Sequence, residues 1–422
     1  MVDVASPLAK DVPANDAGVV GGTGTRLRGE RRKTTSYQQV LTALSRACYS
    51  RILLHCRARI VMCAARHIMN PIISLVVVNY NCKQWLERFF LSLREQTIFD
   101  RCEVIIVDNS STDGSAETCS QEMKSWANGR FLPTGGNYGF GGGCNIGARA
   151  ARGKYLFFLN PDVWFETDCM EAFACHAEAS TAKVFSAVEL GYDGGGFMPG
   201  THGQGAPGFD IFGCTTSPSP KEDLDQLFAI GSFYFIRHDL FEKLGGFDEK
   251  FFMYGEEMDL SWRARIAGES IELVRGARVH HAASGCTDQA GRTTESRRFY
   301  ANRNQLLTIL KNAHGPLLLL AFSQLFLITA ETIVGALLAR KASFVRWSLL
   351  EPVADCWRLR KYIRAQRRII RSYRQRGDWW ITRRFFRFGF GHWVDIKRFL
   401  KGGVTIDKLP AAAKSRLLST PR

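Results

Sequence analysis

The stretch NYGFGGGCNIGARAARGKYLFFLNPD, residues Asn137–Asp162, decides the fold of this chain. Its apolar run Tyr155–Leu159 has the length of a buried strand and lies between a glycine and a proline. Asp162 therefore follows the carboxyl end of a central strand, where open α/β sheets bind their ligands. A helix is predicted over residues 145–152, after a glycine-rich loop that lets a ligand approach the backbone closely. This order of elements is typical of a site for a phosphorylated ligand and its metal.

Predicted strands and helices alternate on both sides of this stretch. The strands are expected at Ile72–Val78, Val104–Val107 and Tyr155–Leu159, and the helices at Trp85–Glu95, Ser115–Met123 and Cys169–Ala179. Alternation of this kind predicts an α/β fold in which a mainly parallel sheet carries helices on both faces.

Charge is distributed unevenly along the 422 residues, whose formal net charge is +16. Residues 341–422 hold 21 Lys/Arg and 5 Asp/Glu, whereas the middle of the chain has more acids than bases. A basic tail suits anionic lipid or nucleic acid, and an acidic cleft suits a divalent cation. These charges leave a membrane partner and a nucleic-acid partner both open.

Several further blocks follow one another in a fixed order. They are ISLVVVNYN (Ile73–Asn81), VIIVDNSSTDGS (Val104–Ser115), the stretch quoted above, GGFDEKFFMYGEEMDLSWR (Gly245–Arg263), VHHAAS (Val279–Ser284) and RRFYANRNQLLTILKN (Arg297–Asn312). In this order they resemble a family 2 glycosyltransferase with the GT-A fold, in its rhamnosyltransferase-like branch. The resemblance covers about residues 70–345. It implies an enzyme that moves a sugar from a nucleotide-diphosphate donor and inverts the anomeric configuration.

Composition, charge and the resemblance together predict three parts of the chain. Residues 1–70 form a basic, partly disordered extension, 71–312 the GT-A catalytic domain, and 313–422 a helical, basic and aromatic region associated with the membrane. Function is expected to reside beyond the first part.

Polar residues end the first two predicted strands and face one crevice. The resemblance assigns Asp108 to the imide N–H of uracil or thymine; the alternative is an aspartate that begins a turn before a helix. The glycine-rich loop would line the diphosphate; alternatively it is a plain tight loop. The residues assigned to the donor are Asn79, Tyr80, Asn81, Asp108, Asn109, Asn137, Gly139, Phe140, Gly141, Asn145, Asn160 and Arg303.

Asp162 is the candidate metal ligand, because a divalent cation (Mg²⁺ or Mn²⁺) held by carboxylates compensates a leaving diphosphate. The family usually has two acids separated by one residue here, whereas this chain has Asn160 at the first position. The resemblance adds His280 as a second ligand. The alternatives are a loop acid and a structural histidine.

The acid pair Glu256–Glu257 opens a predicted helix after the aromatic run Phe251–Tyr254. A displacement at the anomeric carbon needs a base for the acceptor hydroxyl, and a carboxylate in a partly apolar wall suits that task. The resemblance places the base at Glu257, and Glu256 remains the alternative. Acids that only stabilise a helix N-terminus are the other reading.

Leu317–Ala339 is the most apolar window and reaches the length of a bilayer span. Both the catalytic body and the basic tail beyond it favour the cytoplasm, so an in-plane helix or a hairpin is expected in place of a single span. Nine Arg/Lys and no acid lie between Trp357 and Gly377. We therefore expect a peripheral or monotopic enzyme on an anionic membrane surface, at the cytoplasmic face of the inner membrane, with a glycan or lipid-linked acceptor.

Two other functions stay open from the residues alone. A nucleotidyltransferase uses a similar sheet, and a nucleic-acid-binding protein can use basic residues interleaved with aromatics.

Overall fold

The computed structural model describes residues 71–194, 196, 208–216, 225–282, 294–339 and 342–387. The chain divides into two compact units, Met1–Ile68 and Met69–Arg422, and every described residue lies in the second. The predicted extension over residues 1–70 lies outside the described residues. The boundary predicted after residue 312 remains a prediction.

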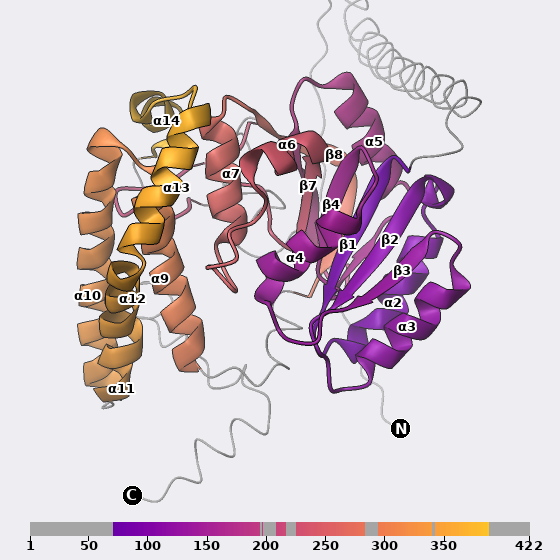
Figure 1. Ribbon diagram of the computed structural model, residues 1–422, viewed down its shortest axis with the longest axis horizontal. Helices are drawn as coiled ribbons and strands as arrows, with labels where there is room; N and C mark the ends of the chain where they lie inside the picture. The colour runs from indigo at the N-terminus through magenta and orange to yellow at the C-terminus, as the bar shows by residue number, and fades with distance from the viewer. Residues whose placement is uncertain are drawn as a thin grey trace, which may run out of the picture. The chain divides into compact units, whose positions relative to one another are not determined.

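The described residues form one eight-stranded sheet with the order β3-β2-β1-β4-β7-β6-β8-β5 (Figure 1). β3, β2, β1 and β4 run parallel, as predicted, while β7 is antiparallel to both β4 and β6. β8 is parallel to β6 and antiparallel to β5. The strands are β1 (Ile73–Asn79), β2 (Cys102–Asp108), β3 (Gly129–Pro133), β4 (Tyr155–Leu159), β5 (Val163–Phe165), β6 (Val184–Gly191), β7 (Phe233–Arg237) and β8 (Ile271–His281).

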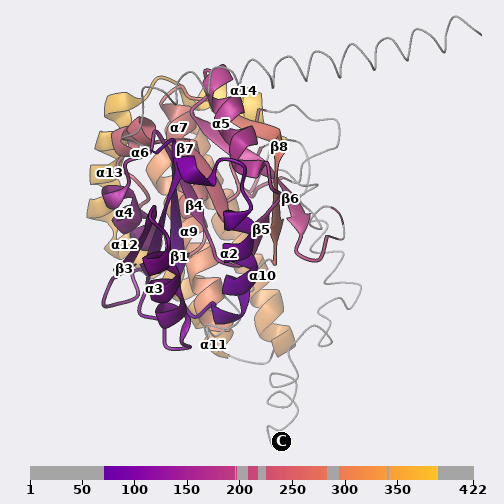
Figure 2. The same cartoon turned by 90° about the vertical axis from the view of Figure 1, so that its right-hand side faces the viewer.

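Alternating side chains of the strands build a core on each face of the sheet. Leu75 and Val77 of β1 pack with helices α2, α3 and α5, whereas Val76 and Val78 pack with α4, α6 and α7 (Figures 1 and 2). These helices are α2 (Lys83–Arg94), α3 (Ser115–Ser125), α5 (Cys169–Ala179), α4 (Gly139–Ala150), α6 (His238–Leu244) and α7 (Glu256–Ile266), and a short 3₁₀ turn, η1 (Phe99–Arg101), precedes β2. The predicted α/β class with helices on both faces is confirmed.

Helix α4 corrects one prediction. It begins at Gly139, six residues before the predicted start, so the glycine run forms its first turns and is not a loop. A Cβ at Gly143 would lie 2.8 Å from Cγ1 of Val78, and one at Gly147 would lie 2.3 Å from Cγ1 of Val76. These glycines therefore let α4 pack closely on β1, a packing requirement that propensity alone does not reveal.

A group of helices follows the sheet and packs on α7. α9 contacts α7, and α10, α12 and α13 contact α9 (Figure 1). Their shared core includes Phe251, Leu307 and Ile363. The elements are α9 (Thr294–Asn312), η2 (Gly315–Leu319), α10 (Leu320–Ala339), α11 (Ala342–Val345), the π-helical turn η3 (Arg346–Leu350), α12 (Glu351–Arg358), α13 (Arg360–Tyr373) and α14 (Asp378–Phe385).

Candidate active site

The ends of β1 and β2 lie side by side, because Asn79 pairs with Asp108 in the parallel register. Nδ2 of the buried Asn79 donates to the Asp108 carboxylate over 2.7 Å. That carboxylate also accepts the backbone N–H of Ser111 (3.1 Å) and its hydroxyl (2.6 Å). Tyr80 follows at the strand end, half-buried. The bonds observed at Asp108 are those of a turn-forming aspartate, and its contact with a nucleobase remains a prediction.

Three asparagines extend this network toward α4. Oδ1 of Asn81, whose φ is 54°, accepts the backbone N–H of Thr112 over 2.7 Å. Asn109 donates to the carbonyl of Gly139 over 2.9 Å. The N–H of Gly139 in turn donates to Oδ1 of Asn137, also over 2.9 Å. The structure thus brings the predicted residues of both strand ends together with the first turn of α4.

Other residues assigned to the donor point into the protein. The Asn145 amide donates to the carbonyl of Phe247 (2.8 Å) and accepts its N–H (2.9 Å). Phe140 packs in the core beside the Phe247 ring. The buried Arg303 guanidinium lies 3.4 Å from the Asp355 carboxylate. For these three residues the observed contacts are internal, and contact with the donor remains a prediction.

The two adjacent histidines differ in their position relative to Asp162. Val163 pairs with His281 and Trp164 with His280, so the two imidazoles lie on opposite faces of β8. Nε2 of His281 lies 3.7 Å from Oδ1 of the buried Asp162. The His280 ring instead stacks on Trp164, with centroids 3.5 Å apart, and its Nδ1 lies 3.1 Å from the Gly191 carbonyl. The histidine beside Asp162 is therefore His281.

Glu189 on β6 holds His281 from the other side. Its Oε1 lies 2.8 Å from Nδ1 of His281, and both side chains are buried. Burial by itself lowers the pKa of His281, but the bond to Glu189 and the charges of Asp162 and Glu189 outweigh it and raise that pKa. A carboxylate behind the second ring nitrogen is the usual support of a metal-binding histidine. Sequence reasoning missed Glu189, because only the β6–β8 pairing brings the two residues together.

The side chains at Asp162 fit a cation that is shared with a substrate. No cluster of three or more His, Cys, Asp or Glu side chains that could hold a metal ion occurs among the described residues. Mg²⁺ is commonly bound through one or two carboxylates plus substrate phosphates and water. Asp162 and His281 supply one carboxylate and one imidazole. This suits a cation whose remaining coordination positions are filled by a diphosphate.

This geometry makes a prediction about the two histidines. His281→Gln is expected to weaken Mn²⁺ binding roughly 10- to 100-fold, the range for a lost ligand or its support. His280→Gln, its neighbour on the other face of β8, is the matched control and is expected to leave that affinity unchanged. Titration of the purified protein with Mn²⁺, followed by electron paramagnetic resonance in the presence of a nucleoside diphosphate, measures both. Equal losses in the two variants would contradict the assignment.

The acid pair begins α7 and its two side chains point to different neighbours. A Cβ at Gly231 would lie 2.9 Å from Cγ and 3.0 Å from Cδ of Glu257, so this side chain lies against the backbone just before β7. The next carbonyl, that of Ser232, accepts the N–H of Asn160 over 3.1 Å. Glu257 thus lies against Gly231, and the next residue, Ser232, is bonded to Asn160, two residues before Asp162.

Glu256 points the other way and lies against α4. A Cβ at Gly141 would lie 3.8 Å from Cβ and Cγ of Glu256. Glu256 is buried, whereas Glu257 is partly accessible. Burial raises the pKa of Glu257, although backbone N–H groups at the start of α7 oppose the shift. A raised pKa makes a carboxylate a stronger base, and the catalytic role of Glu257 remains a prediction.

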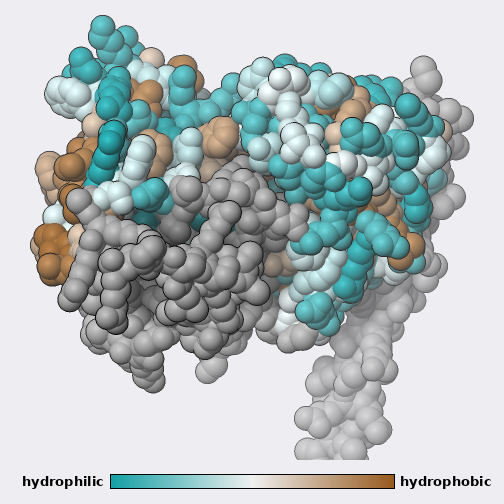
Figure 3. Space-filling model, turned by 90° about the horizontal axis from the view of Figure 1, so that it is seen from below, coloured by the Kyte–Doolittle hydropathy of each residue, from teal (hydrophilic) through white to brown (hydrophobic). Residues whose placement is uncertain are grey.

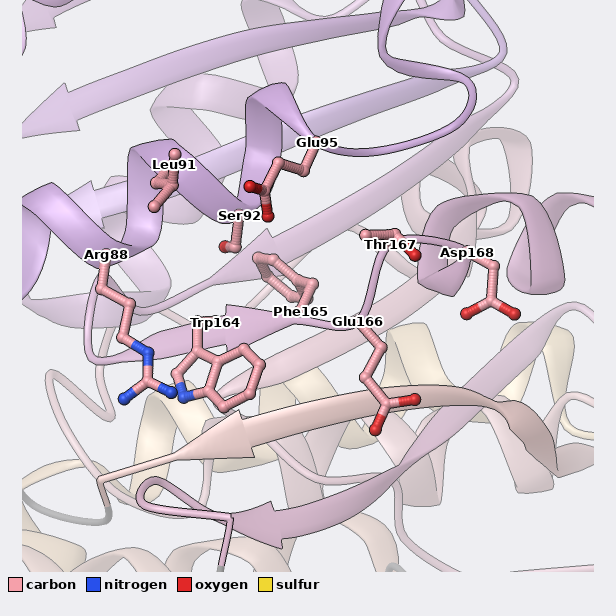
Figure 4. A pocket seen from close by; sticks show the side chains of 9 residues that line it. All are labelled: Arg88, Leu91, Ser92, Glu95, Trp164, Phe165, Glu166, Thr167 and Asp168. Atoms are coloured by element: carbon pink, nitrogen blue, oxygen red, sulfur yellow. The ribbon is translucent and has the colours of Figure 1, made fainter.

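A surface hollow of about 580 Å³ lies between α2 and β5, with Arg88, Glu95, Trp164 and Glu166 among its lining residues (Figure 4). The Arg88 guanidinium covers the Trp164 ring at 4.0 Å, and His280 covers the same ring system by stacking. None of the residues predicted for catalysis, donor or metal lines this hollow.

Comparison with known proteins identifies the family. Residues 74–245 match the family model described as glycosyl transferase family 2. An N-acetylglucosaminyl-diphospho-decaprenol L-rhamnosyltransferase of Mycobacterium tuberculosis is 30% identical over 244 residues, which cover 51% of this chain and 78% of that protein. The low-salt glycan biosynthesis hexosyltransferase Agl10 of Haloferax volcanii is 26% identical over 209 residues, 48% of this chain and 64% of that relative's length.

The chain belongs to glycosyltransferase family 2, and it is similar to rhamnosyltransferases within that family. Among solved structures, S. aureus TarS (residues 1–349, in complex with UDP) aligns with a TM-score of 0.46 and 16% identity, covering 72% of this chain and 89% of that one. The family match confirms the predicted membership, and together with the observed sheet it confirms the predicted fold class.

Proposed function

We propose that this glycosyltransferase moves a sugar, rhamnose in the first instance, from a nucleotide-diphosphate donor to a lipid-linked or growing cell-surface glycan, with inversion. The observation that carries the proposal is the placement of Glu257 against Gly231, next to the Ser232–Asn160 bond and the strand end that bears Asp162. A candidate base, Glu257, and a candidate ligand for the cation that binds the leaving diphosphate, Asp162, thus lie at the same end of the strands. The similarity to rhamnosyltransferases supports the choice of sugar.

In this proposal Glu257 takes the proton of the acceptor hydroxyl as its oxygen attacks the anomeric carbon. The new carbon–oxygen bond forms on one face of the sugar while the bond to the diphosphate oxygen breaks on the other, so a single displacement inverts the configuration. The nucleoside diphosphate leaves with the bonding electrons. Burial raises the pKa of Glu257 and so favours proton transfer from a weakly acidic hydroxyl.

Asp162 and His281 are the residues that would hold a divalent cation (Mg²⁺ or Mn²⁺). Such an ion, when bound, supplies positive charge to the leaving diphosphate. Glu189 would keep Nε2 of His281 turned toward Asp162. Asn160 would supply only a neutral amide, so Asp162 is the one carboxylate of this strand end that would contact the ion.

The apolar helix supports a membrane location. Gly315–Leu337 is long and apolar enough to cross a membrane, the one such helix among the described residues. One face of α10 is buried, including the polar Gln324 and Thr332, while the opposite face exposes large apolar side chains, Phe322 at 72%. Hydrophobic side chains gather at the left edge of Figure 3, the side that carries α10 in Figure 1. The outward-facing residues are Leu319, Phe322, Phe326, Ile333 and Leu337.

We propose that this face lies in the plane of the bilayer interface, at the cytoplasmic side. A helix with one packed face and one apolar exposed face suits insertion in that plane. The basic residues of α13 divide into two groups. Arg367 donates to the carbonyls of Leu310 and Ala313, each over 2.7 Å, and so supports the end of α9. The exposed group, available for anionic headgroups, includes Lys361, Arg364, Arg368 and Arg371.

Replacing Lys361, Arg364, Arg368 and Arg371 with Gln is expected to weaken the salt-sensitive part of membrane binding, since each basic residue near an anionic surface contributes about 1 kcal/mol. Co-sedimentation with vesicles of neutral and of anionic lipid, at low and high salt, measures this. Arg367→Gln is the control, and it should lower thermal stability without changing the salt dependence. Retention of wild-type salt dependence in the quadruple variant would contradict the proposal.

Incubation of the purified protein with a panel of nucleotide sugars tests the function. Release of a nucleoside diphosphate from one or a few of them is expected. Release of pyrophosphate from a nucleoside triphosphate would instead favour a nucleotidyltransferase, and RNA retained on a filter at high salt would favour a nucleic-acid-binding protein.

A further inference from the structure

The segment that leads into the acid pair has an unfavourable backbone. Phe252 and Tyr254 have φ values of 63° and 65°, in the left-handed region that residues with a Cβ rarely adopt. Glu256 and Glu257 follow within three residues. Such conformations persist only where the surroundings impose them, and they concentrate at functional sites.

Asn304 of α9 contacts three carbonyls of this segment. Nδ2 of Asn304 lies 3.0 Å from the carbonyl of Phe251, 2.6 Å from that of Met253 and 2.6 Å from that of Tyr254. Asn304 is 1% exposed. The two N–H groups of this amide are shared among the three carbonyls, and the Phe251 carbonyl also accepts the N–H of Met253 (2.7 Å) and an N–H of Arg303 (3.3 Å).

The opposite side of the segment rests on the first turn of α4. The N–H of Phe140 donates to the Phe252 carbonyl over 3.0 Å. A Cβ at Gly139, whose φ is +74°, would lie 2.0 Å from that carbonyl oxygen. The segment is thus held between α4, at the predicted donor edge of the sheet, and α9.

Buried charges fix α9 relative to the acid-pair helix. The fully buried Lys311 lies between Asp248, with which it forms an ion pair, and Asp259 of α7 at 2.9 Å. Tyr362 of α13 donates to Asp248 over 2.6 Å. Although Asp259 is buried, the charges of Lys311 and Arg263 outweigh burial and keep its pKa low. These contacts hold α9, and with it Asn304, in a fixed position relative to α7.

We propose that Asn304 is a positioning residue for the acid pair: by holding the segment Phe251–Tyr254, in which Phe252 and Tyr254 are left-handed, it places the Glu257 carboxylate against Gly231. The inference rests on the proposed function, since it assigns Asn304 a role in the same transfer. It also makes α9, which lies outside the sheet, a part of the catalytic apparatus.

The test compares Asn304→Ala with Asn302→Ala. Asn302 lies on the same helix and also donates to a carbonyl, that of Ser348 over 2.7 Å, away from the acid pair. Asn304→Ala is expected to lower kcat roughly 10- to 100-fold, because small misplacements of a catalytic group have effects of this size. Donor affinity, measured by calorimetry, should change less than about twofold, since the donor edge is retained. Asn302→Ala should retain kcat.

A readout specific to positioning is the pH profile of kcat/KM. Displacing Glu257 toward water should move the acid limb of the Asn304→Ala profile to lower pH, a change that a general loss of stability does not produce. If Asn304→Ala does not fold, Asn304→Ser, which keeps one donor, takes its place. Equal kcat and an unmoved limb in a folded variant would overturn the inference while wild-type turnover still upholds the proposed function. An absence of wild-type turnover would overturn both.

Discussion

Glu257→Gln is expected to lower sugar transfer at least ~10²-fold, the contribution of a positioned general base. The amide keeps the shape of the side chain against Gly231 but cannot accept the acceptor's proton. Donor affinity should survive, because the base contacts the acceptor hydroxyl and not the nucleotide. Initial rates with saturating donor, beside calorimetric donor binding, separate the two effects. Glu256→Gln is the matched control, since Glu256 lies against α4. A damaging Glu256→Gln together with a mild Glu257→Gln would move the base by one position.

The same substitution has a predicted stability signature. Because burial raises the folded-state pKa of Glu257 above its unfolded value, the folded protein favours the protonated carboxyl. Stability from this group is present below the unfolded pKa and is lost as pH rises through the folded pKa. Above that range Glu257→Gln should be at least as stable as the wild type. Loss of stability at neutral pH would show that the carboxylate is structural.

Asp162→Asn is expected to abolish donor turnover, and EDTA is expected to have the same effect on the wild-type enzyme. The family usually has a second acid at the position of Asn160. In this chain Asp162 is therefore the one carboxylate of this strand end, and the substitution removes it. The amide keeps the size of the side chain but removes the charge that attracts a hard cation. Turnover is measured as nucleoside diphosphate release with and without added Mn²⁺. Full activity of the wild-type enzyme in EDTA would contradict metal dependence.

Local sequence patterns predicted the framework of the sheet. Tyr155–Leu159 and Cys169–Ala179 form the expected strand and helix with the same bounds, because an apolar run and a 3.6-residue period are local signals. The start of α4 was mispredicted because glycine disfavours a helix in isolation. In this protein the close approach of Gly143 and Gly147 to β1 outweighs that preference.

Long-range pairing determined what the sequence left undecided. His280 and His281 are adjacent, and only the register of β5 against β8 decides which of them faces Asp162. Glu189 and Asn304 lie 92 and 53 residues away in sequence from the groups they support. No local pattern marks either residue. The position of the acid pair at the start of a helix, by contrast, could be predicted from the sequence, because a helix start after an aromatic run is a local feature.

The stereochemistry of transfer tests the central claim most directly. With a nucleotide sugar and an acceptor that the enzyme accepts, ¹H NMR of the glycoside product reports the configuration at the anomeric carbon, which is fixed once the glycosidic bond has formed. A single displacement assisted by Glu257 predicts a product whose configuration is opposite to that of the donor. A product that retains the donor's configuration would contradict the account, since it requires either two displacements or a different path at this site.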